Sequence, residues 1–307
     1  MSEPIFDKVA LIGIGLIGAS LAHAIRRAGA AVHVAGYSPS AEQRAVAKKI
    51  GFADSLPETL GDAARDADLV VLAAPVGAFA GIAKEIAPHL KQGAILSDVG
   101  SVKSAVLRDV GPHVPAGVHF IPAHPIAGTE QSGPAAGFAE LFDDRWCILT
   151  PPAGADAAAL EKLKTFWQRL GSQVEVMDAH HHDLVLAITS HVPHLIAYNI
   201  VGTADDLSSV TKSEVIKYSA GGFRDFTRIA ASDPTMWRDV FLNNKDAVLE
   251  VLGRFSEDLS ALQRAIRWGD GEALFNLFAR TRAIRRGIID AGQDSAAPNF
   301  GRNVQKK

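Results

Sequence analysis

Short apolar runs alternate with amphipathic stretches up to Asp178. Helix-like segments such as LIGASLAHAIRRAG and AEQRAVAKKIG lie between the runs. Strand-like runs separated in this way are typical of crossover units, so the pattern predicts an α/β domain with a parallel, doubly wound sheet. The runs expected to form strands are, in chain order, KVALIGIG, AAVHVAGY, DLVVLAAP, AILSDVG, VHFIPAHP, WCILTPP and SQVEVMD.

The pattern changes after Asp178, where strand-like runs stop and long amphipathic stretches follow. This spacing of apolar residues predicts an all-helical second half. The three stretches open with HHHDLVLAITSHVPH, PTMWRDVFLNNKD and GEALFNLFARTRA. We therefore expect an α/β domain over residues 1–178, a helical domain over residues 179–291 and a polar tail over residues 292–307.

The helical half has more apolar surface than its own residues can cover. Broad apolar faces run along segments such as VFLNNKDAVLEVLGRF. Obligate interfaces bury large apolar areas, so we expect the chain to form a homodimer.

Composition indicates a soluble protein that acts on small molecules. The chain has 307 residues, 48% of them hydrophobic, and its 31 basic and 34 acidic residues give a net charge of −3. No strong field favours nucleic acid or a membrane surface, so neither is expected as a partner. The single cysteine, Cys147, excludes an internal disulfide and suits a reducing compartment. The start MSEPIFDK has no long apolar stretch, and we expect a cytoplasmic location.

A glycine-rich turn, GIGLIG, follows the first strand directly and opens the first helix. Its glycines are Gly13, Gly15 and Gly18. In this setting backbone amides and a helix N-terminus receive the pyrophosphate of a dinucleotide, so the turn predicts a Rossmann-type nucleotide site.

The end of the second strand bears on the choice between NAD and NADP. An acidic residue usually stands there and accepts hydrogen bonds from the adenosine ribose. This sequence has Ser38 instead, which neither binds the diol as a carboxylate does nor repels a 2′-phosphate. We expect NAD, with NADP as the alternative, and Arg44 is close enough in sequence to meet the extra phosphate.

Two loops at strand ends carry candidate chemistry. AHPIAGTE, residues 123–130, follows an apolar strand, and it is either a plain turn or the setting of a functional His124. SDVGSVK, residues 97–103, leaves another strand at the edge where open α/β sheets bind ligands. In that segment Ser101 alternatively caps the next helix and Lys103 is alternatively solvated.

The segment HHHDLVLAITSHVPHLIAY holds most of the chain's clustered histidines. Successive helical side chains point about 100° apart, so His180, His181 and His182 cannot all face one ion, and no metal is expected. His194 follows Pro193, which disturbs a helix interior and frees backbone groups. This position favours His194 as a site residue, with a core histidine as the alternative.

A third segment, GGFRDFTRIAASDPTMW, places two arginines and an aspartate among apolar residues. Arg224, Asp225 and Arg228 form either a structural ion-pair network or a guanidinium fork that an acid orients toward a substrate carboxylate.

Together these segments resemble the prephenate and arogenate dehydrogenases of tyrosine biosynthesis. The resemblance rests on GIGLIG, DVGSVK, HPIAGTE, SHVPH and FRDFTRIAASDPTMWRD, in that order, from about residue 8 to about residue 290. It implies a dinucleotide-binding domain, a helical domain that binds substrate and dimerises, and oxidative decarboxylation of a cyclohexadienyl acid, prephenate or arogenate.

The resemblance also assigns roles to particular residues. It implies a catalytic set of His124, Ser101 and His194, a substrate-binding set of Arg228, Thr129, Glu130 and Trp237, and a cofactor-binding set of Gly13, Gly15, Leu16, Ile17, Gly18, Ser38, Pro75 and Ser101. In this assignment His124 takes the hydroxyl proton of the substrate as hydride leaves the same carbon, because imidazole has a pKa near working pH.

Two alternatives stay open at this point. A two-domain dehydrogenase of the β-hydroxyacid or 6-phosphogluconate type would use a catalytic lysine, and the helical half has none in the SHVPH setting. A dinucleotide sensor without turnover would need the glycine-rich turn but neither a base nor an arginine for a carboxylate.

Overall fold

The structure is a computed structural model, and it describes residues 3–129, 131–206 and 220–290. The chain divides into one compact unit up to Leu249 and a second from Glu250 onward, and each is described by itself.

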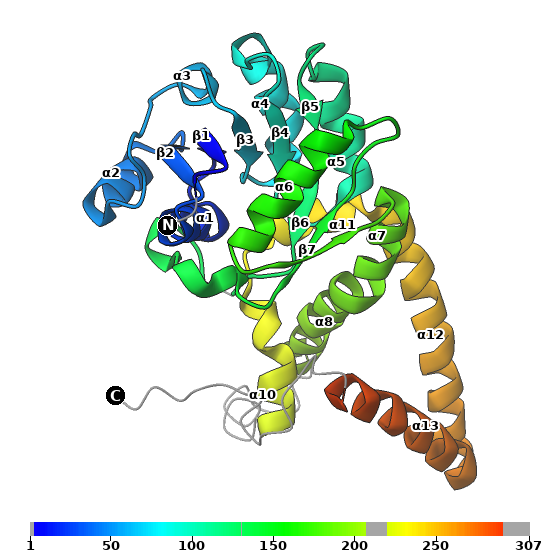
Figure 1. Ribbon diagram of the computed structural model, residues 1–307. Coiled ribbons are helices and arrows are strands. Elements are labelled where there is room, and N and C mark those ends of the chain that lie inside the picture. The colour runs from blue at the N-terminus through cyan, green and yellow to red at the C-terminus, as the bar shows by residue number, and fades with distance from the viewer. Residues whose placement is uncertain (1–2, 130, 207–219, 291–307) are drawn as a thin grey trace. The chain divides into compact units, whose positions relative to one another are not determined.

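Five parallel strands form the central sheet of the first unit, in the order β2-β1-β3-β4-β5 (Figure 1). The connections reverse direction between β1 and β3, and open sheets of this kind bind ligands beyond the carboxyl ends of their strands at that point. The strands are β1 (Phe6–Ile12), β2 (Ala31–Tyr37), β3 (Leu69–Leu72), β4 (Ile95–Asp98) and β5 (His119–Phe120).

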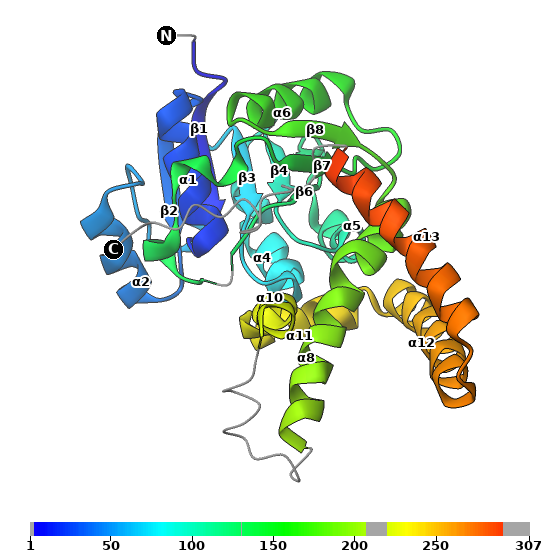
Figure 2. The ribbon, with the colours of Figure 1, turned by 90° about the horizontal axis from the view of Figure 1, so that it is seen from below.

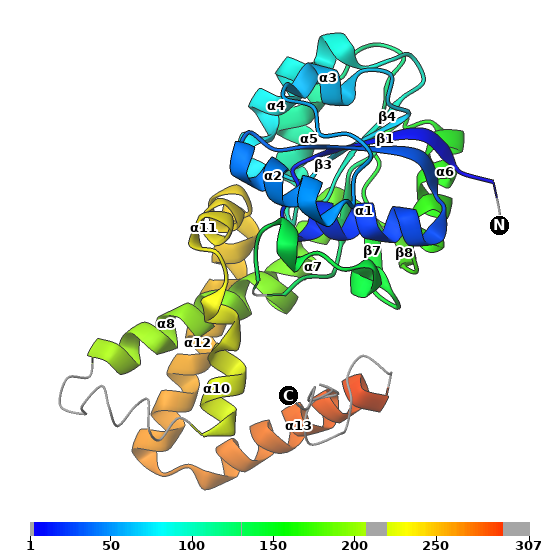
Figure 3. The same cartoon turned by 90° about the vertical axis from the view of Figure 1, so that its left-hand side faces the viewer.

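Helices cover both faces of this sheet, which Figure 3 shows nearly edge-on. Alternate side chains of a strand point to opposite faces. Val9 and Leu11 of β1 join the core that includes α1 and α6, whereas Ala10 and Ile12 join the core that includes α3, α4 and α5. This arrangement confirms the predicted doubly wound fold. The helices are α1 (Leu16–Ala28), α2 (Ala41–Ile50), α3 (Leu60–Ala64), α4 (Phe79–Ile86), α5 (Lys103–Val110) and α6 (Ala157–Arg169).

The run VHFIPAHP, expected as one strand, is divided at Pro122. The amides that donate to β4 or to the residue before it are those of His119 and Ile121, and the next in the alternation, that of Ala123, donates to the Asp98 side chain, so the ladder with β4 ends at Ile121. The next strand, β6 (Ala123–Pro125), pairs antiparallel with β7 (Trp146–Leu149), which is parallel to β8 (Gln173–Val176). The last expected strands therefore form a separate three-stranded sheet.

Every regular element that the structure describes after Asp178 is helical, as expected. Within the first unit, α8 lies beside α10 and the turn that follows it, which Figure 2 shows from below. The elements are α7 (Ala179–Leu186), the π-helical turn η6 (Ala187–His191), α8 (Val192–Asp206), α10 (Gly221–Thr227), the 3-10 turn η7 (Arg228–Ala231), α11 (Pro234–Asn243), α12 (Lys245–Trp268) and α13 (Gly271–Asp290). The domain division predicted at residue 178 stays a prediction.

The second unit contains the rest of α12 and the whole of α13, joined at Gly269, whose φ is 68°. Several large apolar side chains of these helices are more than half exposed in the single chain. They are Leu259, Ile266, Trp268, Phe275, Phe278 and Ile284.

The glycines of the turn between β1 and α1 have different structural roles. Gly13 has a φ of 115°, and a Cβ there would lie 2.4 Å from the carbonyl oxygen of Ala73. A Cβ on Gly18 would lie 1.9 Å from the carbonyl oxygen of Gly13. Gly15, in contrast, has no atom within 4 Å of an added Cβ, so its place in the turn leaves open space for a bound group.

We expect Gly18→Ala to destabilise the fold and Gly15→Ala to leave it nearly unchanged. The added methyl group at Gly18 meets backbone that cannot move without shifting β1, which should lower the free energy of unfolding by about 1–3 kcal/mol. At Gly15, the residue immediately before α1, the free energy of unfolding should fall by less than about 1 kcal/mol. Urea denaturation of both variants measures the difference, and equal midpoints would contradict it.

Candidate active site

His124 lies in β6, and the backbone of this strand is held by a buried ion pair. The Asp98 carboxylate accepts a hydrogen bond from the amide of Ala123 at 3.1 Å. The Lys103 ammonium donates to Asp98 at 2.5 Å and to the carbonyl oxygen of Ala123 at 2.6 Å. Both charged side chains are fully buried. The residue before His124 is therefore fixed through its amide and through its carbonyl group.

Lys103 is thus not solvated, which corrects one expectation from the sequence. Burial lowers the pKa of Lys103 and raises that of Asp98, and the opposite charge of each opposes the shift of the other. The other alternative, that Ser101 caps the next helix, is also wrong. Val102 is the residue before α5, and its side chain makes no capping hydrogen bond.

A second histidine contacts His124 directly. The Nδ1 atom of His124 lies 2.8 Å from Nε2 of His182, and Nδ1 of His182 lies 2.9 Å from the Asp183 carboxylate. His182 is fully buried and His124 is 9% exposed. Burial lowers the pKa of His124 well below its usual range and also lowers that of His182. Both rings are therefore neutral at ordinary pH.

The Asp183 carboxylate also caps α5. It accepts hydrogen bonds from the amides of Lys103 at 2.7 Å and Ser104 at 2.8 Å, which are free donors at the start of that helix. These bonds and the one to His182 lower the pKa of Asp183 although burial opposes the shift. An ionised carboxylate from α7 thus holds both a helix of the central fold and the histidine beside His124.

Helix α7 continues directly into a wider, π-helical turn, η6, which ends just before Val192 and Pro193. Turns of this kind recur at functional sites. The ring Nδ1 of His194 lies 2.9 Å from the carbonyl oxygen of Ser190, so His194 bonds a backbone group near the proline. Its ring stacks on Trp237 with centroids 3.7 Å apart.

His191, the last residue of this turn, is fully buried and contacts the residue that follows α11. Its Nδ1 lies 3.0 Å from the side-chain nitrogen of Asn244, which also donates to the carbonyl oxygen of Asp183 at 2.8 Å. Burial lowers the pKa of His191 to about 4, and the neighbouring Ser101 backbone opposes that shift. His191 therefore lies near the backbone of Ser101.

Arg228 is the first residue of η7, after α10, and it is exposed. Burial lowers the pKa of His194, and the positive charge of Arg228 lowers it further. The Arg228 guanidinium therefore lies near the His194 ring. The structure thus brings Arg228, His194 and Trp237 together. The predicted pairing of Arg228 with Asp225 stays a prediction.

The structure says less about the other two predicted substrate residues, Thr129 and Glu130. Thr129 is exposed, and its hydroxyl accepts a hydrogen bond from the amide of Gln131 at 3.2 Å. Glu130 lies outside the residues that the structure describes.

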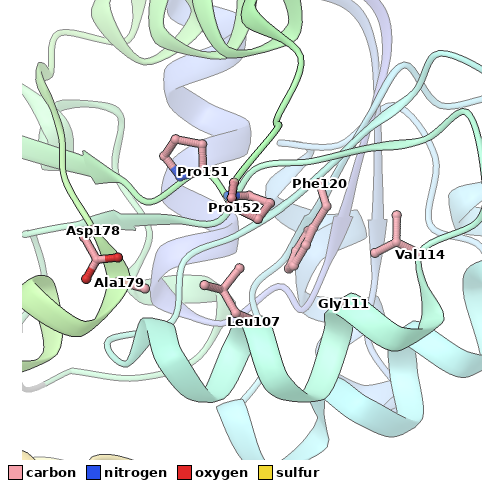
Figure 4. A pocket seen from close by; sticks show the side chains of 9 residues that line it. Leu107, Gly111, Val114, Phe120, Pro151, Pro152, Asp178 and Ala179 are labelled. Atoms are coloured by element: carbon pink, nitrogen blue, oxygen red, sulfur yellow. The ribbon is translucent and has the colours of Figure 1, made fainter.

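A pocket of about 430 Å³ lies away from the predicted site residues, between α5 and the start of α7 (Figure 4). Its walls include Leu107, Phe120, Pro151 and Pro152, and its one carboxylate, Asp178, is engaged with the first amides of α7. The pocket contains none of the predicted catalytic or cofactor-binding residues.

Most of the predicted cofactor residues lie in the turn after β1 and at the start of α1. Gly15, Leu16, Ile17 and Gly18 form the start of α1, which has no side-chain cap, so its first amides are available to a phosphate. Pro75 follows β3 and precedes a short turn, η1 (Val76–Ala78). The open space at Gly15 fits a dinucleotide pyrophosphate.

Ser38 is buried at the end of β2 and is bound by its neighbours. Its hydroxyl donates to Gln43 at 2.7 Å and accepts from the amide of Ser40 at 3.2 Å. The Arg44 guanidinium donates to the Ser38 carbonyl oxygen at 2.6 Å. A cation therefore lies beside Ser38, the residue that stands in place of the usual acidic residue.

Sequence patterns missed five residues of this site: Asp98, Lys103 as a buried group, the pair of His182 and Asp183, and Asn244. The three adjacent histidines attracted attention only as metal ligands. Among the described residues no group of three or more histidine, cysteine, aspartate or glutamate side chains is placed to hold a metal ion. A short polar sequence next to a helix start gave no sign of which histidine is buried.

The continuous helical run Ala179–Asp206 is long and apolar enough to cross a membrane by length and composition. In this fold it supplies the buried side chains of His182, Asp183 and His191 to the site. These three polar side chains of the run are therefore buried against other parts of the same fold.

Comparisons with known proteins agree with this architecture. The family model described as prephenate dehydrogenase, nucleotide-binding domain, matches residues 21–176, and the one described as prephenate dehydrogenase, dimerization domain, matches residues 178–280. A cyclohexadienyl dehydrogenase of Zymomonas mobilis is 42% identical over 281 residues, which cover 92% of this chain and 96% of that protein. A prephenate dehydrogenase of Bacillus subtilis is 33% identical over 298 residues, covering 96% of this chain and 79% of that protein.

Solved structures show the same likeness. Prephenate dehydrogenase from A. aeolicus, in complex with hydroxyphenyl propionate and NAD+, has a TM-score of 0.85 and 34% identity, covering 92% of this chain and 98% of that chain. Synechocystis arogenate dehydrogenase has a TM-score of 0.75 and 26% identity, covering 91% and 99%. The order of motifs, the fold and these matches agree, and the chain belongs to the prephenate dehydrogenase family.

Proposed function

We propose that this protein oxidises and decarboxylates a cyclohexadienyl acid, prephenate, arogenate or both, with a nicotinamide cofactor. The products would be 4-hydroxyphenylpyruvate from prephenate and tyrosine from arogenate. The observation that carries the proposal is His124, a buried neutral imidazole whose Nδ1 is occupied by His182. A general base for an alcohol needs this form, with the other ring nitrogen left to the substrate.

The chain's residues divide the work of the reaction. The bound cofactor supplies the hydride acceptor. Nε2 of His124 accepts the proton of the ring hydroxyl as the C–H bond to the same carbon breaks. The bond from the ring to its carboxylate then breaks, carbon dioxide leaves, and the electron pair makes the ring aromatic, so that the ring oxygen becomes a phenolate and takes back the proton from His124. Alignment is the protein's main contribution, because aromatisation itself drives the step.

The helical residues bind the substrate in this proposal. Arg228 receives a carboxylate of the substrate, since a guanidinium matches carboxylate geometry with two parallel hydrogen bonds. His194 and Trp237, stacked on each other, form an adjoining wall, and the backbone of Ser101 lies near the buried His191. Thr129 and Glu130 belong to the same binding region. A β-hydroxyacid-type mechanism is less well supported, because it would use a catalytic lysine and the SHVPH segment of the helical half has none.

The cofactor site supports use of both NAD and NADP, with NAD preferred. Gly13, Gly15 and Gly18 shape the turn, and Leu16, Ile17 and Pro75 lie at its edges. Ser38 gives no charge repulsion against a 2′-phosphate, and Arg44 supplies a cation beside it.

We also propose that the enzyme works as a cytoplasmic homodimer. The exposed apolar side chains of α12 and α13, among them Trp268 and Phe275, are the surface that association would bury.

Replacing the base should stop turnover and leave binding intact. We expect His124→Asn to lower kcat by roughly two to four powers of ten, because the hydroxyl proton loses its acceptor. In the wild type, kcat/KM should fall with decreasing pH only below the usual histidine range, since burial lowers the pKa of His124 and the protonated ring cannot act as a base. Cofactor fluorescence titration and kinetics measure both effects. The exposed His180→Asn is the control, and wild-type turnover in His124→Asn would refute the assignment.

Arg228 tests whether the helical residues hold the substrate. We expect Arg228→Ala to raise the KM for prephenate or arogenate by about thirtyfold to several thousandfold, the range for a lost charged contact to a carboxylate. The cofactor KM and the melting temperature should change little, and Arg228→Lys should recover only part of the loss. Arg238→Ala, an exposed arginine paired with Asp239, serves as control. A variant that binds substrate normally but melts early would make Arg228 structural.

Arg44 tests the cofactor preference. We expect wild-type kcat/KM to favour NAD modestly, and Arg44→Ala to lower kcat/KM for NADP roughly tenfold, while the value for NAD stays within about threefold. Lys48→Ala, on the exposed face of the same helix, should change neither value. A wild-type preference for NADP above about a hundredfold would show that Ser38 was misinterpreted.

A further inference from the structure

We propose that His182 and Asp183 are positioning residues that fix the tautomer of His124, with the proton on Nδ1 and the lone pair on Nε2. The proposal rests on the proposed role of His124 as the base. Neither residue needs to touch the substrate, because both act through His124.

The direction of each hydrogen bond follows from the Asp183 carboxylate, which can only accept. It is 2.9 Å from Nδ1 of His182, so this nitrogen carries a proton. A neutral His182 then has its lone pair on Nε2. That atom is 2.8 Å from Nδ1 of His124, which must therefore be the donor. The proton of a neutral His124 is thus on Nδ1, and Nε2 can accept the substrate's proton.

The opposite arrangement would prevent catalysis. If His182 were doubly protonated, its Nε2 would donate to His124, and the single proton of a neutral His124 would move to Nε2. The buried surroundings oppose that state, since burial lowers the pKa of His182. The neutral state of His182 is therefore a condition for the base to work.

The charged groups around the two rings support the same arrangement. Lys103 and Asp98 form a closed ion pair next to β6, and neutral His191 and the buried thiol of Cys147 complete the surroundings. Asp183 is the anion that is hydrogen-bonded to His182. When His124 takes a proton, the new positive charge lies two hydrogen bonds from this carboxylate, which stabilises it.

Asp183 is itself held in several directions. Its carboxylate accepts the amides of Lys103 and Ser104, and its carbonyl oxygen accepts from Asn244. The carboxylate therefore cannot turn away from His182 without uncapping α5. This rigidity is what an orienting acid requires, and it also means that Asp183 variants would mix a catalytic effect with a structural one. His182 is the better residue to change.

The tautomer can be measured without any turnover. Long-range ¹H–¹⁵N correlation spectra of protein labelled with ¹⁵N-histidine distinguish Nδ1–H, Nε2–H and doubly protonated rings, and the His124→Asn spectrum assigns the His124 signals. At neutral pH we expect Nδ1–H for both His124 and His182. An Nε2–H tautomer for His124, or a doubly protonated His182, would overturn the proposal. This readout stays decisive even if the protein oxidises neither prephenate nor arogenate.

Two substitutions of His182 separate positioning from packing. His182→Phe keeps a ring of similar shape and removes the acceptor, whereas His182→Gln keeps an acceptor near the place of Nε2. We expect His182→Phe to lower kcat roughly tenfold to a hundredfold, with substrate and cofactor KM values within about threefold of wild type, and His182→Gln to recover a large part of the loss. His181→Phe, an exposed neighbour on the same helix, should match wild type.

The ¹H–¹⁵N spectrum of the His182→Phe variant completes the test. In His182→Phe we expect His124 to lose its fixed tautomer and show a mixture of the two neutral forms. An unchanged kcat, an unchanged Nδ1–H signal for His124, or equal losses in the Phe and Gln variants would each overturn the positioning role.

Discussion

The Asp183 carboxylate is the interaction on which the site depends. It stands at the start of the helical half, yet two of its hydrogen bonds go to the first amides of α5 and a third goes to His182. One buried anion therefore satisfies helix donors that have no partner of their own and sets the proton positions in two imidazole rings. If it were neutral or absent, both the joint between α7 and α5 and the orientation of His124 would be lost together.

The buried pair of Lys103 and Asp98 performs the complementary task on the other side of His124. Burying two charges is costly, and such pairs contribute little net stability even when they are well bonded. Here the pair engages both the amide and the carbonyl group of Ala123, so it fixes the short strand β6. The ring of His124 is thus held by its own hydrogen bond to His182, and its backbone is held by this ion pair.

Neutrality recurs throughout the site for one physical reason. His124, His182 and His191 are buried, and burial penalises the charged form of each ring. A neutral histidine carries one donor and one acceptor, so a chain of them can transmit direction from a single carboxylate. The π-helical turn before Pro193 belongs to this arrangement, because its last residue, His191, contacts Asn244, and the ring of His194 bonds the carbonyl oxygen of Ser190 within it.

The sequence by itself determined the doubly wound fold, the helical second half and the glycine-rich turn, because these follow from periodicity and from local backbone requirements. It also singled out His124, His194, Arg228 and Trp237 through the resemblance of their motifs. Tertiary structure decided which histidine of the HHHD segment is buried, that Lys103 is a buried ion-pair partner, and that Pro122 divides an expected strand. His124 and His182 are 58 residues apart in sequence. Pairs of this kind, and the burial that makes their rings neutral, depend on how separate elements pack, and no local pattern encodes that.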